Sequence, residues 1–349
     1  MSTTLARLAL FWVCFASGIF LSRAEAPLSP VILVERPSAI NEFTADPAQV
    51  KQMVNQALLT LTSSQDIGTA WRRLGITPKD IVGIKINTVG GPAFCTHHSL
   101  VRAICAGLQA AGVPASQIII WDKLPDRMTR AGYAPQAAAP GQPAIMSVSP
   151  DHYDPQVTYH SGVVGSLIYG DYQFVDSLDY VGDPTNDPVL TFSYYTSIVT
   201  QTCTKIINVP VLTDDSFIGM KACLGSLALG SVDNNRRFQG PPTYGDPDLC
   251  SILNRPFFRD KVVVNILDAL VAQYAGGPKF HPEFTQEPGA LYVSRDPVAI
   301  DSLVLPRLEK WRLAANVPPI GNTASYIQDA AAYGLGTTNK SQIQLIRLP

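Results

Sequence analysis

The chain has 349 residues, of which 46% are hydrophobic and 15% charged, and its formal net charge is -2. This balance, with no basic stripe, excludes a nucleic-acid backbone as the expected partner. Five cysteines follow the first 26 residues and none forms a Cys-x-x-Cys pair, so we expect no iron-sulfur cluster and mostly buried thiols.

Residues 1–26 have the pattern of an export signal. Arg7 precedes an apolar run over 8–21, and Ala24-Glu25-Ala26 has the small-x-small pattern of a signal-peptidase site. We therefore expect an exported protein, periplasmic or extracellular, that meets a membrane only through this segment. Pro27 is unfavourable directly after a cut, so an uncleaved anchor is the alternative, although the run is shorter than the ~20 residues of a spanning helix.

Residues 27–79 are expected to form an extended lead-in followed by two helices. Asp46-Pro47 has the order of a helix cap and first turn, and apolar residues recur behind it at helical spacing. The second, shorter helix ends at Gly75.

Residues 81–122 predict a strand, a helix and a second strand. The strands cover 81–87 and 117–122, and the apolar face of the helix runs from Leu100 to Ala111. This order predicts a βαβ unit with parallel strands and a right-handed crossover.

The rest of the chain combines an irregular insertion with a return to alternating elements. Residues 125–200 are rich in Pro, Gly, Tyr and Asp, and we expect a lid or insertion there with strands near 172–175 and 189–193. Later strands are predicted at 205–209, 261–267, 290–293 and 343–348, and helices at 218–229, from Asp296-Pro297 onward and at 325–333. The sequence thus predicts an α/β domain over 80–349, with a mostly parallel, doubly wound sheet, helices on both faces and two lobes.

Several predicted strands finish on a carboxylate or an amide. These residues are Asn87, Asp122, Asn208, Asp268 and, just beyond its strand, Asp296. In open parallel sheets ligands bind outside the carboxyl ends of the strands, so we expect a ligand crevice there. Each residue taken singly also fits a turn or helix cap.

Charged residues near these strand ends are the candidates for chemistry. Lys85 faces the same side of its strand as Asn87, and a buried ammonium needs a structural carboxylate, an anionic ligand or a metal-binding carboxylate as its partner. His97 falls at a helix start. Asp214 and Asp215 are candidates for a hard-cation site or an acid/base pair, with solvated loop acids as the alternative.

Basic residues in two loops are candidates for binding an anion. Arg236 and Arg237 suit bidentate capture of a carboxylate or phosphate, unless they are only a surface pair. Lys279 follows Gly276-Gly277-Pro278 in a second loop. No nucleophile elbow, zinc-protease motif, Walker loop or dinucleotide fingerprint is present.

Six stretches, taken in order, resemble the domain-of-unknown-function family 362 over residues 80–348. They are Lys85-Ile86-Asn87, Thr96-His97, 208–214, 230–235, Asp268 with 276–279, and 296–301. The chain resembles the exported branch that lacks an iron-sulfur module, and the resemblance implies no established reaction.

Three positions depart from that family's pattern. Asp215 and Gln239 stand where this branch usually has histidines, and Gly225-Ser226 stands where it has Lys-Asn. Lys221 lies one helical turn before Gly225 and is a candidate to supply the missing ammonium.

From these features we predict an enzyme-like protein that binds a small anionic ligand, with or without a divalent metal. The catalytic candidates are Lys85, His97, Asp215 and Lys221; the ligand-binding candidates are Asn87, Asn208, Asn235, Arg236, Arg237 and Lys279; and the metal-binding candidates are Asp122, Asp214, Asp268 and Asp301. A non-catalytic envelope binding protein is one alternative. An isomerase or racemase similar to the nickel-pincer lactate racemases is another, on fold analogy alone.

Overall fold

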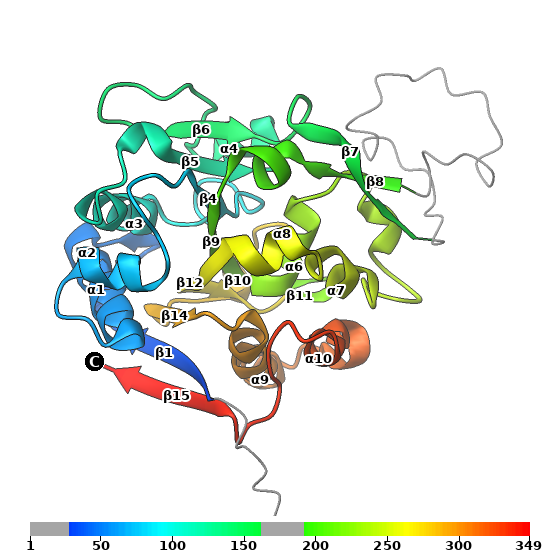
Figure 1. Ribbon diagram of the computed structural model, residues 1–349. Helices are drawn as coiled ribbons and strands as arrows, with labels where there is room; N and C mark the ends of the chain where they lie inside the picture. Colours follow the sequence, from blue (N-terminus) through cyan, green and yellow to red (C-terminus); the bar gives the residue numbers. More distant parts are fainter. Residues whose placement is uncertain (1–27, 162–191) are drawn as a thin grey trace, which may run out of the picture.

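The computed structural model describes residues 28–161 and 192–349, which are organised around one 11-stranded sheet (Figure 1). Its strands are β1 (Ser29–Glu35), β4 (Val82–Ile86), β5 (Ile118–Asp122), β6 (Ala144–Ser147), β9 (Lys205–Val209), β10 (Val211–Asp215), β11 (Gly219–Lys221), β12 (Val262–Gln273), β13 (Thr285–Gln286), β14 (Ala290–Ser294) and β15 (Ile343–Leu348). Two hairpins stand apart from it, β2 (Ile40–Asn41) with β3 (Thr44–Ala45) and β7 (Tyr153–His160) with β8 (Phe192–Thr196).

The sheet is mostly parallel, as the strand-helix order predicts. Along the path β15-β1-β14-β12-β9-β4-β5-β6, the five strands from β12 to β6 run parallel, and only β14 is antiparallel to both of its neighbours. β4 and β9, which come from different halves of the chain, are hydrogen-bonded neighbours. The two predicted lobes therefore share a single sheet.

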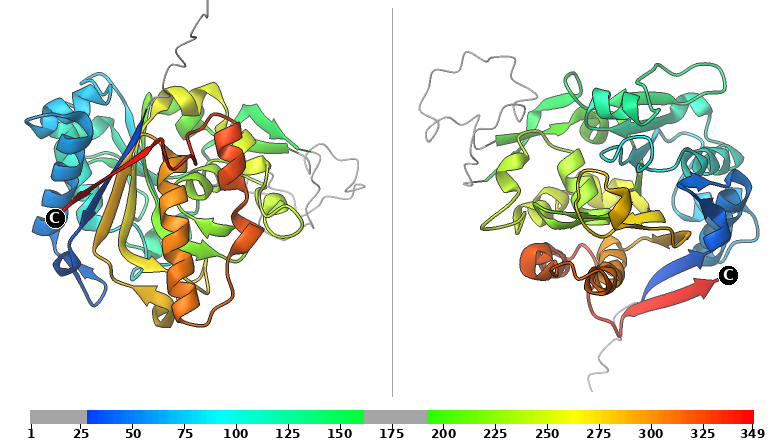
Figure 2. Two further views of the ribbon diagram at one scale, coloured as in Figure 1. Left: turned by 90° about the horizontal axis from the view of Figure 1, so that it is seen from below. Right: turned by 180° about the vertical axis from the view of Figure 1, so that it is seen from behind.

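Helices cover both faces of this sheet (Figure 2). They are α1 (Pro47–Thr62), α2 (Ile67–Arg73), α3 (His98–Ala110), α4 (Pro125–Arg130), α6 (Cys223–Gly230), α7 (Asp248–Leu253), α8 (Pro256–Lys261), α9 (Pro297–Ala314) and α10 (Tyr326–Ala332). Alternate strand residues enter two cores: Ile118 and Ile120 pack on the side of α1 to α3, whereas Ile119 and Trp121 pack on the side of α6, α7, α9 and α10. The predicted doubly wound α/β class is confirmed.

Two predicted helix starts have the expected capping chemistry. The Asp46 carboxylate accepts hydrogen bonds from the backbone N–H groups of Ala48 and Gln49, and Asp296 accepts one from Ala299. A proline follows each cap, where its missing N–H removes no helical hydrogen bond.

The predicted helix over 218–229 is wrong in its first half. β11 pairs with β10 there as a hairpin, and α6 begins only at Cys223. The Asp215 carboxylate accepts hydrogen bonds from the N–H groups of Phe217 and Ile218, and Gly219 has a φ of +79°, a conformation that glycine adopts without a Cβ clash. Turn chemistry therefore overrides the apolar spacing.

Two further segments differ from expectation. The extended lead-in contains β1, which lies between β14 and β15 in the main sheet, and the insertion contributes β6 to the sheet and α4 beside it. The strand expected near 172–175 and the export signal lie outside the described residues. The strand expected near 189–193 corresponds to β8, which is described from Phe192.

Two findings concern membrane spans and the cysteines of the described residues. Within 28–161 and 192–349 no helix combines the length and the apolar character that a membrane span requires. The five cysteines of these ranges are buried and free of disulfides, as expected for core residues.

Candidate functional site

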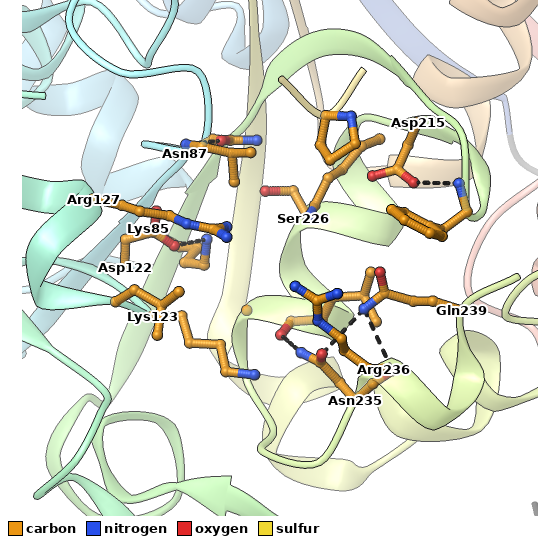
Figure 3. Close-up of a pocket in the computed structure, with 17 residues that line it drawn as sticks. Lys85, Asn87, Asp122, Lys123, Arg127, Asp215, Ser226, Asn235, Arg236 and Gln239 are labelled. Atoms are coloured by element: carbon orange, nitrogen blue, oxygen red, sulfur yellow. Dashed lines mark hydrogen bonds and ion pairs between the residues drawn. The ribbon is translucent and has the colours of Figure 1, made fainter. Parts of the chain in front are cut away.

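A polar pocket opens at the carboxyl ends of β4 and β5, on the α6 side of the sheet (Figure 3). Its volume is about 370 Å³, which lies in the range of small-molecule sites. α4, the β10–β11 hairpin, the end of α6 and the loop after α6 complete its wall. The predicted site residues that line it are Lys85, Asn87, Asp122, Asp215, Lys221, Asn235 and Arg236.

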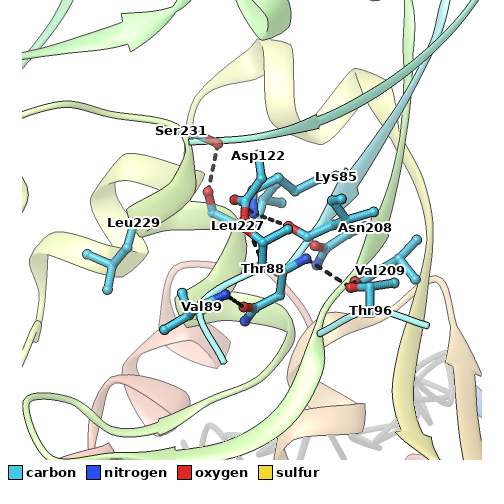
Figure 4. Close-up of polar contacts among 12 residues, drawn as sticks. Lys85, Thr88, Val89, Thr96, Asp122, Asn208, Val209, Leu227, Leu229 and Ser231 are labelled. Atoms are coloured by element: carbon cyan, nitrogen blue, oxygen red, sulfur yellow. Dashed lines mark hydrogen bonds and ion pairs between the residues drawn. The ribbon is translucent and has the colours of Figure 1, made fainter. Parts of the chain in front are cut away.

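Lys85 and Asp122 form a buried ion pair at the base of the pocket (Figure 4). The ammonium nitrogen of Lys85 lies 2.8 Å from one Asp122 oxygen and donates to the Ile86 carbonyl at 2.6 Å. The other Asp122 oxygen accepts hydrogen bonds from the backbone N–H and hydroxyl of Thr88. Burial by itself raises the pKa of Asp122, but Lys85 and these hydrogen bonds outweigh it and lower the pKa.

Gly230, the last residue of α6, lies directly against the Lys85 side chain. A Cβ added at Gly230 would be 2.3 Å from Lys85 Cε and 2.8 Å from Nζ. Only a residue without a side chain leaves room for the ammonium to reach Asp122.

Gly230→Ala is therefore expected to lower the free energy of unfolding by about 1–3 kcal/mol, the range for overpacking a filled site. Urea denaturation at pH 7 measures this loss. In a Lys85→Met background the same substitution should have a smaller effect, because the thioether has no ion pair to preserve. Equal losses in both backgrounds would show that the Lys85 contact is not the cause.

Asp215 presents an unpartnered carboxylate oxygen at the pocket. Its side chain is 2% exposed, and one oxygen accepts the two backbone hydrogen bonds that shape the turn after β10. The other oxygen is buried and has no hydrogen-bond partner among the described residues, and it points toward Ser226 in Figure 3. Such an orphaned acceptor is unfavourable by about 1–3 kcal/mol unless a donor reaches it.

Lys221 is the free ammonium of the pocket. It lies opposite Thr213 in the β10–β11 hairpin and makes no hydrogen bond or ion pair with any described residue. Burial lowers the pKa of Lys221; Lys85 and Arg127 lower it further, against the attraction of Asp215 and Asp122. A lysine of this kind loses its proton more readily than a solvated one, and its neutral amine can accept a proton from a ligand.

Arg127 and Ser226 are pocket residues that the sequence analysis missed. The Arg127 guanidinium, on α4, makes no hydrogen bond or ion pair with a described residue, and burial lowers its pKa. The Ser226 hydroxyl on α6 is also without a hydrogen-bond partner in the described chain and points toward the pocket interior (Figure 3). Arg127 lies in α4, a short helix directly after the strand β5, and this position is a signal for a residue at the carboxyl end of the sheet. It was missed because residues 125–200 were treated as an insertion.

A second, more open cavity of about 660 Å³ adjoins the pocket and shares lining residues with it. Two glycine-rich loops line it, Gly90-Gly91-Pro92 and 276–279, the second of which carries Lys279. The two cavities together are lined by seven cationic residues, Lys85, Lys123, Arg127, Arg130, Lys221, Arg236 and Lys279, but by only two acidic ones, Asp122 and Asp215. A chain with a net charge of -2 therefore concentrates positive charge at this site.

His97 and Asp268 lie on the opposite face of the sheet from the pocket. The Asp268 carboxylate accepts a hydrogen bond from the His97 backbone N–H at 2.8 Å and pairs with its Nδ1 at 2.8 Å. Burial lowers the pKa of His97, but the Asp268 carboxylate more than reverses this, so the pKa is raised. Because His97 occupies the N-cap position of α3, its pairing with Asp268 ties the start of that helix to β12.

Four other candidates also lie away from the pocket lining. Asn208 donates to Asn265 and to the Cys223 carbonyl, and Asp214 accepts from the Gly277 N–H. The other two candidates, Arg237 and Asp301, also make hydrogen bonds to protein groups.

Arg237 directs its guanidinium at protein acceptors, the carbonyls of Asn234 and Ser161 and the hydroxyl of Ser193. Asp301 accepts hydrogen bonds from the N–H groups of Cys223 and Leu224 and so caps α6. These two side chains support the structure around the pocket.

The predicted metal ligands are not brought together. Asp122 is paired with Lys85, Asp268 with His97, and Asp301 with a helix start, so each carboxylate has a separate protein partner. Among residues 28–161 and 192–349, no three His, Cys, Asp or Glu side chains are grouped to hold a metal ion. Within the described residues, the predicted metal ligands are therefore not assembled into one site.

Comparisons with known proteins identify no family. No protein-family model matches the chain, and no curated protein matches it. Among solved structures, a Thermotoga maritima protein determined as a structural-genomics target is similar at 10% identity, with a TM-score of 0.39 over 80% of this chain. The chain spans 61% of the length of that protein. The resemblance to family 362 thus stays a prediction.

Proposed function

We propose that this protein binds a small anionic ligand in the cationic pocket at the carboxyl ends of β4 and β5, and that it does so outside the cytoplasm. The observation that carries the proposal is the concentration of seven cationic and two acidic residues around two adjoining cavities. Export rests on the pattern of residues 1–26 alone.

Two pocket cations are buried in a way that favours binding of an anionic ligand. Lys221 and Arg127 are partly buried and have no hydrogen-bond or ion-pair partner among the described residues. Besides burial, neighbouring positive charges lower the pKa of each side chain: Lys85 and Arg127 act on Lys221, and Arg236 and Arg130 act on Arg127. A bound anion would relieve this repulsion and supply the missing acceptors for charge-assisted hydrogen bonds. Because burial lowers the pKa of Lys221, this ammonium gives up its proton more readily than a solvated lysine, and it is the candidate for proton transfer to a ligand.

Arg127→Gln is expected to weaken anion binding by about 10- to 100-fold, the equivalent of losing one hydrogen bond to a charged group. Because Arg127 has no hydrogen-bond or ion-pair partner among the described residues, the free energy of unfolding of the ligand-free protein should change little in this variant. Titration calorimetry and thermal shifts with phosphate, citrate and pyrophosphate measure both quantities.

Arg102→Gln is the matched control. Arg102 lies exposed on α3 and lines none of the cavities, so its removal changes the net charge equally without touching the site. If all three anions leave the wild-type melting temperature unchanged, or if both variants bind them as the wild type does, the proposal fails.

A further inference from the structure

We infer that the ligand is a small hydroxylated dianion, with one anionic group in the pocket and the second in the outer cavity. The inference rests on the proposed function and deepens it by naming the substrate class. Its evidence is the division of charge between the two cavities together with the orphaned oxygen of Asp215.

The two cavities lie next to each other. They share five lining residues, Val89, Arg127, Phe217, Arg236 and Pro278. The two arginines in this set stand at the junction. A ligand that extends through the junction contacts both cavities at once.

Each cavity has cations of its own. Lys85, Lys123 and Lys221 line only the inner pocket, and Arg130 and Lys279 line only the outer cavity. No acidic side chain of the described chain lines the outer cavity. Because Lys85 is already paired with Asp122, Lys221 is the inner cation that we expect the ligand to neutralise. One anionic group at Lys221 leaves Arg130 and Lys279 without an acidic neighbour in the outer cavity, whereas a ligand with two separated anionic groups reaches both places.

Asp215 adds a requirement for a hydrogen-bond donor at the inner end. Its second oxygen is buried at the pocket wall and has no hydrogen-bond partner among the described residues, so a ligand that donates a hydrogen bond to it gains affinity. An ammonium group would be repelled by the surrounding lysines and arginines. A hydroxyl group is neutral and donates one hydrogen bond, so it fits this position.

Titration calorimetry with propionate, succinate and malate tests both parts of the inference. Propionate and succinate differ by the second carboxylate, and succinate and malate differ only by one hydroxyl group. We expect succinate to bind at least 10-fold more tightly than propionate, and malate at least 10-fold more tightly than succinate. 3-Phosphoglycerate identifies the preferred second anion: tighter binding than malate assigns a phosphate to the outer cavity, and weaker binding assigns a carboxylate.

Two variants locate the effects. The double variant Arg130→Gln/Lys279→Gln should reduce the preference for succinate over propionate to about threefold or less, whereas the exposed pair Arg102→Gln/Lys51→Gln should leave it unchanged. Asp215→Asn keeps the oxygen that shapes the turn but replaces the orphaned acceptor, so it should reduce the malate preference to about threefold or less while succinate still binds.

The outcomes separate this inference from the proposed function. Equal binding of propionate and succinate would overturn the two-anion arrangement, and equal binding of succinate and malate would overturn the hydroxyl contact. In either case, binding of phosphate or citrate that depends on Arg127 would leave the proposed function standing. Failure of every anion to bind would overturn both.

Discussion

Replacing Lys85 with methionine is expected to lower the free energy of unfolding by about 3–5 kcal/mol at pH 7, the range for breaking one side of a buried ion pair. Methionine fills a similar volume, so the loss comes from the charge that remains. Asp122 keeps its hydrogen bonds from Thr88 but loses the ammonium that neutralises it in a buried site.

The pH dependence of this loss has a definite sign. Because the pKa of Asp122 is lowered on folding, its contribution to stability is present above the unfolded pKa and disappears as the pH falls through the folded value. The deficit of Lys85→Met should therefore be largest near neutral pH and shrink in acid, where Asp122 can take up a proton.

Urea denaturation at pH 7 and pH 4 measures both effects. Lys51→Met, on the exposed side of α1, is the matched control and should shift stability by no more than about 0.5 kcal/mol. A deficit for Lys85→Met below about 1 kcal/mol at pH 7 would contradict the role given to the ion pair.

Replacing Asp301 with asparagine is expected to remove a large part of the dependence of stability on pH. Burial raises the pKa of Asp301 to about 7, despite the hydrogen bonds from Leu224 and Cys223 that lower it. The folded protein then holds a proton that the unfolded chain releases. The stability contributed by this proton is full below about pH 4 and is lost as the pH rises through about 7, by a total of about 3–4 kcal/mol.

The comparison needs unfolding free energies of the wild type and Asp301→Asn at pH 4, 5.5 and 7.5. The wild type should lose more stability than the variant over this range, because the amide does not titrate. Asp260→Asn, exposed on α8, should follow the wild type. Parallel pH profiles for the wild type and Asp301→Asn would show that Asp301 does not hold the proton.

Predictions from the sequence were more accurate for the fold than for the candidate site. Apolar runs such as 81–87 and 117–122 predicted β4 and β5, because strands buried on both faces are apolar throughout. The first half of the helix predicted over 218–229 was wrong because a short hairpin and the first turn of α6 give similar apolar spacing. The hydrogen bonds that the Asp215 carboxylate accepts from the N–H groups of Phe217 and Ile218 favour the hairpin.

Reasoning from strand ends found some residues of the candidate site but also selected residues that lie elsewhere. Lys85 and Asp122 were found at adjoining strand ends, and the first of three partners considered for Lys85, a structural carboxylate, is the one observed. His97 and Asp268 came from the same reasoning but face α3, on the other side of the sheet. The face of a strand that a residue occupies depends on pairing register, which spacing along one chain does not give.

By itself, the sequence determined the class of fold, the positions of most buried strands and the capped starts of α1 and α9, because these depend on hydrophobic periodicity and on contacts between near neighbours. Only the tertiary structure decided which charged residues share the pocket. Arg127, Lys221 and Arg236 are distant in sequence, and they meet because β4 and β5 end beside the β10–β11 hairpin. The positive charge of the site is thus a property of the fold, since chain-wide composition averages it to a net charge of -2.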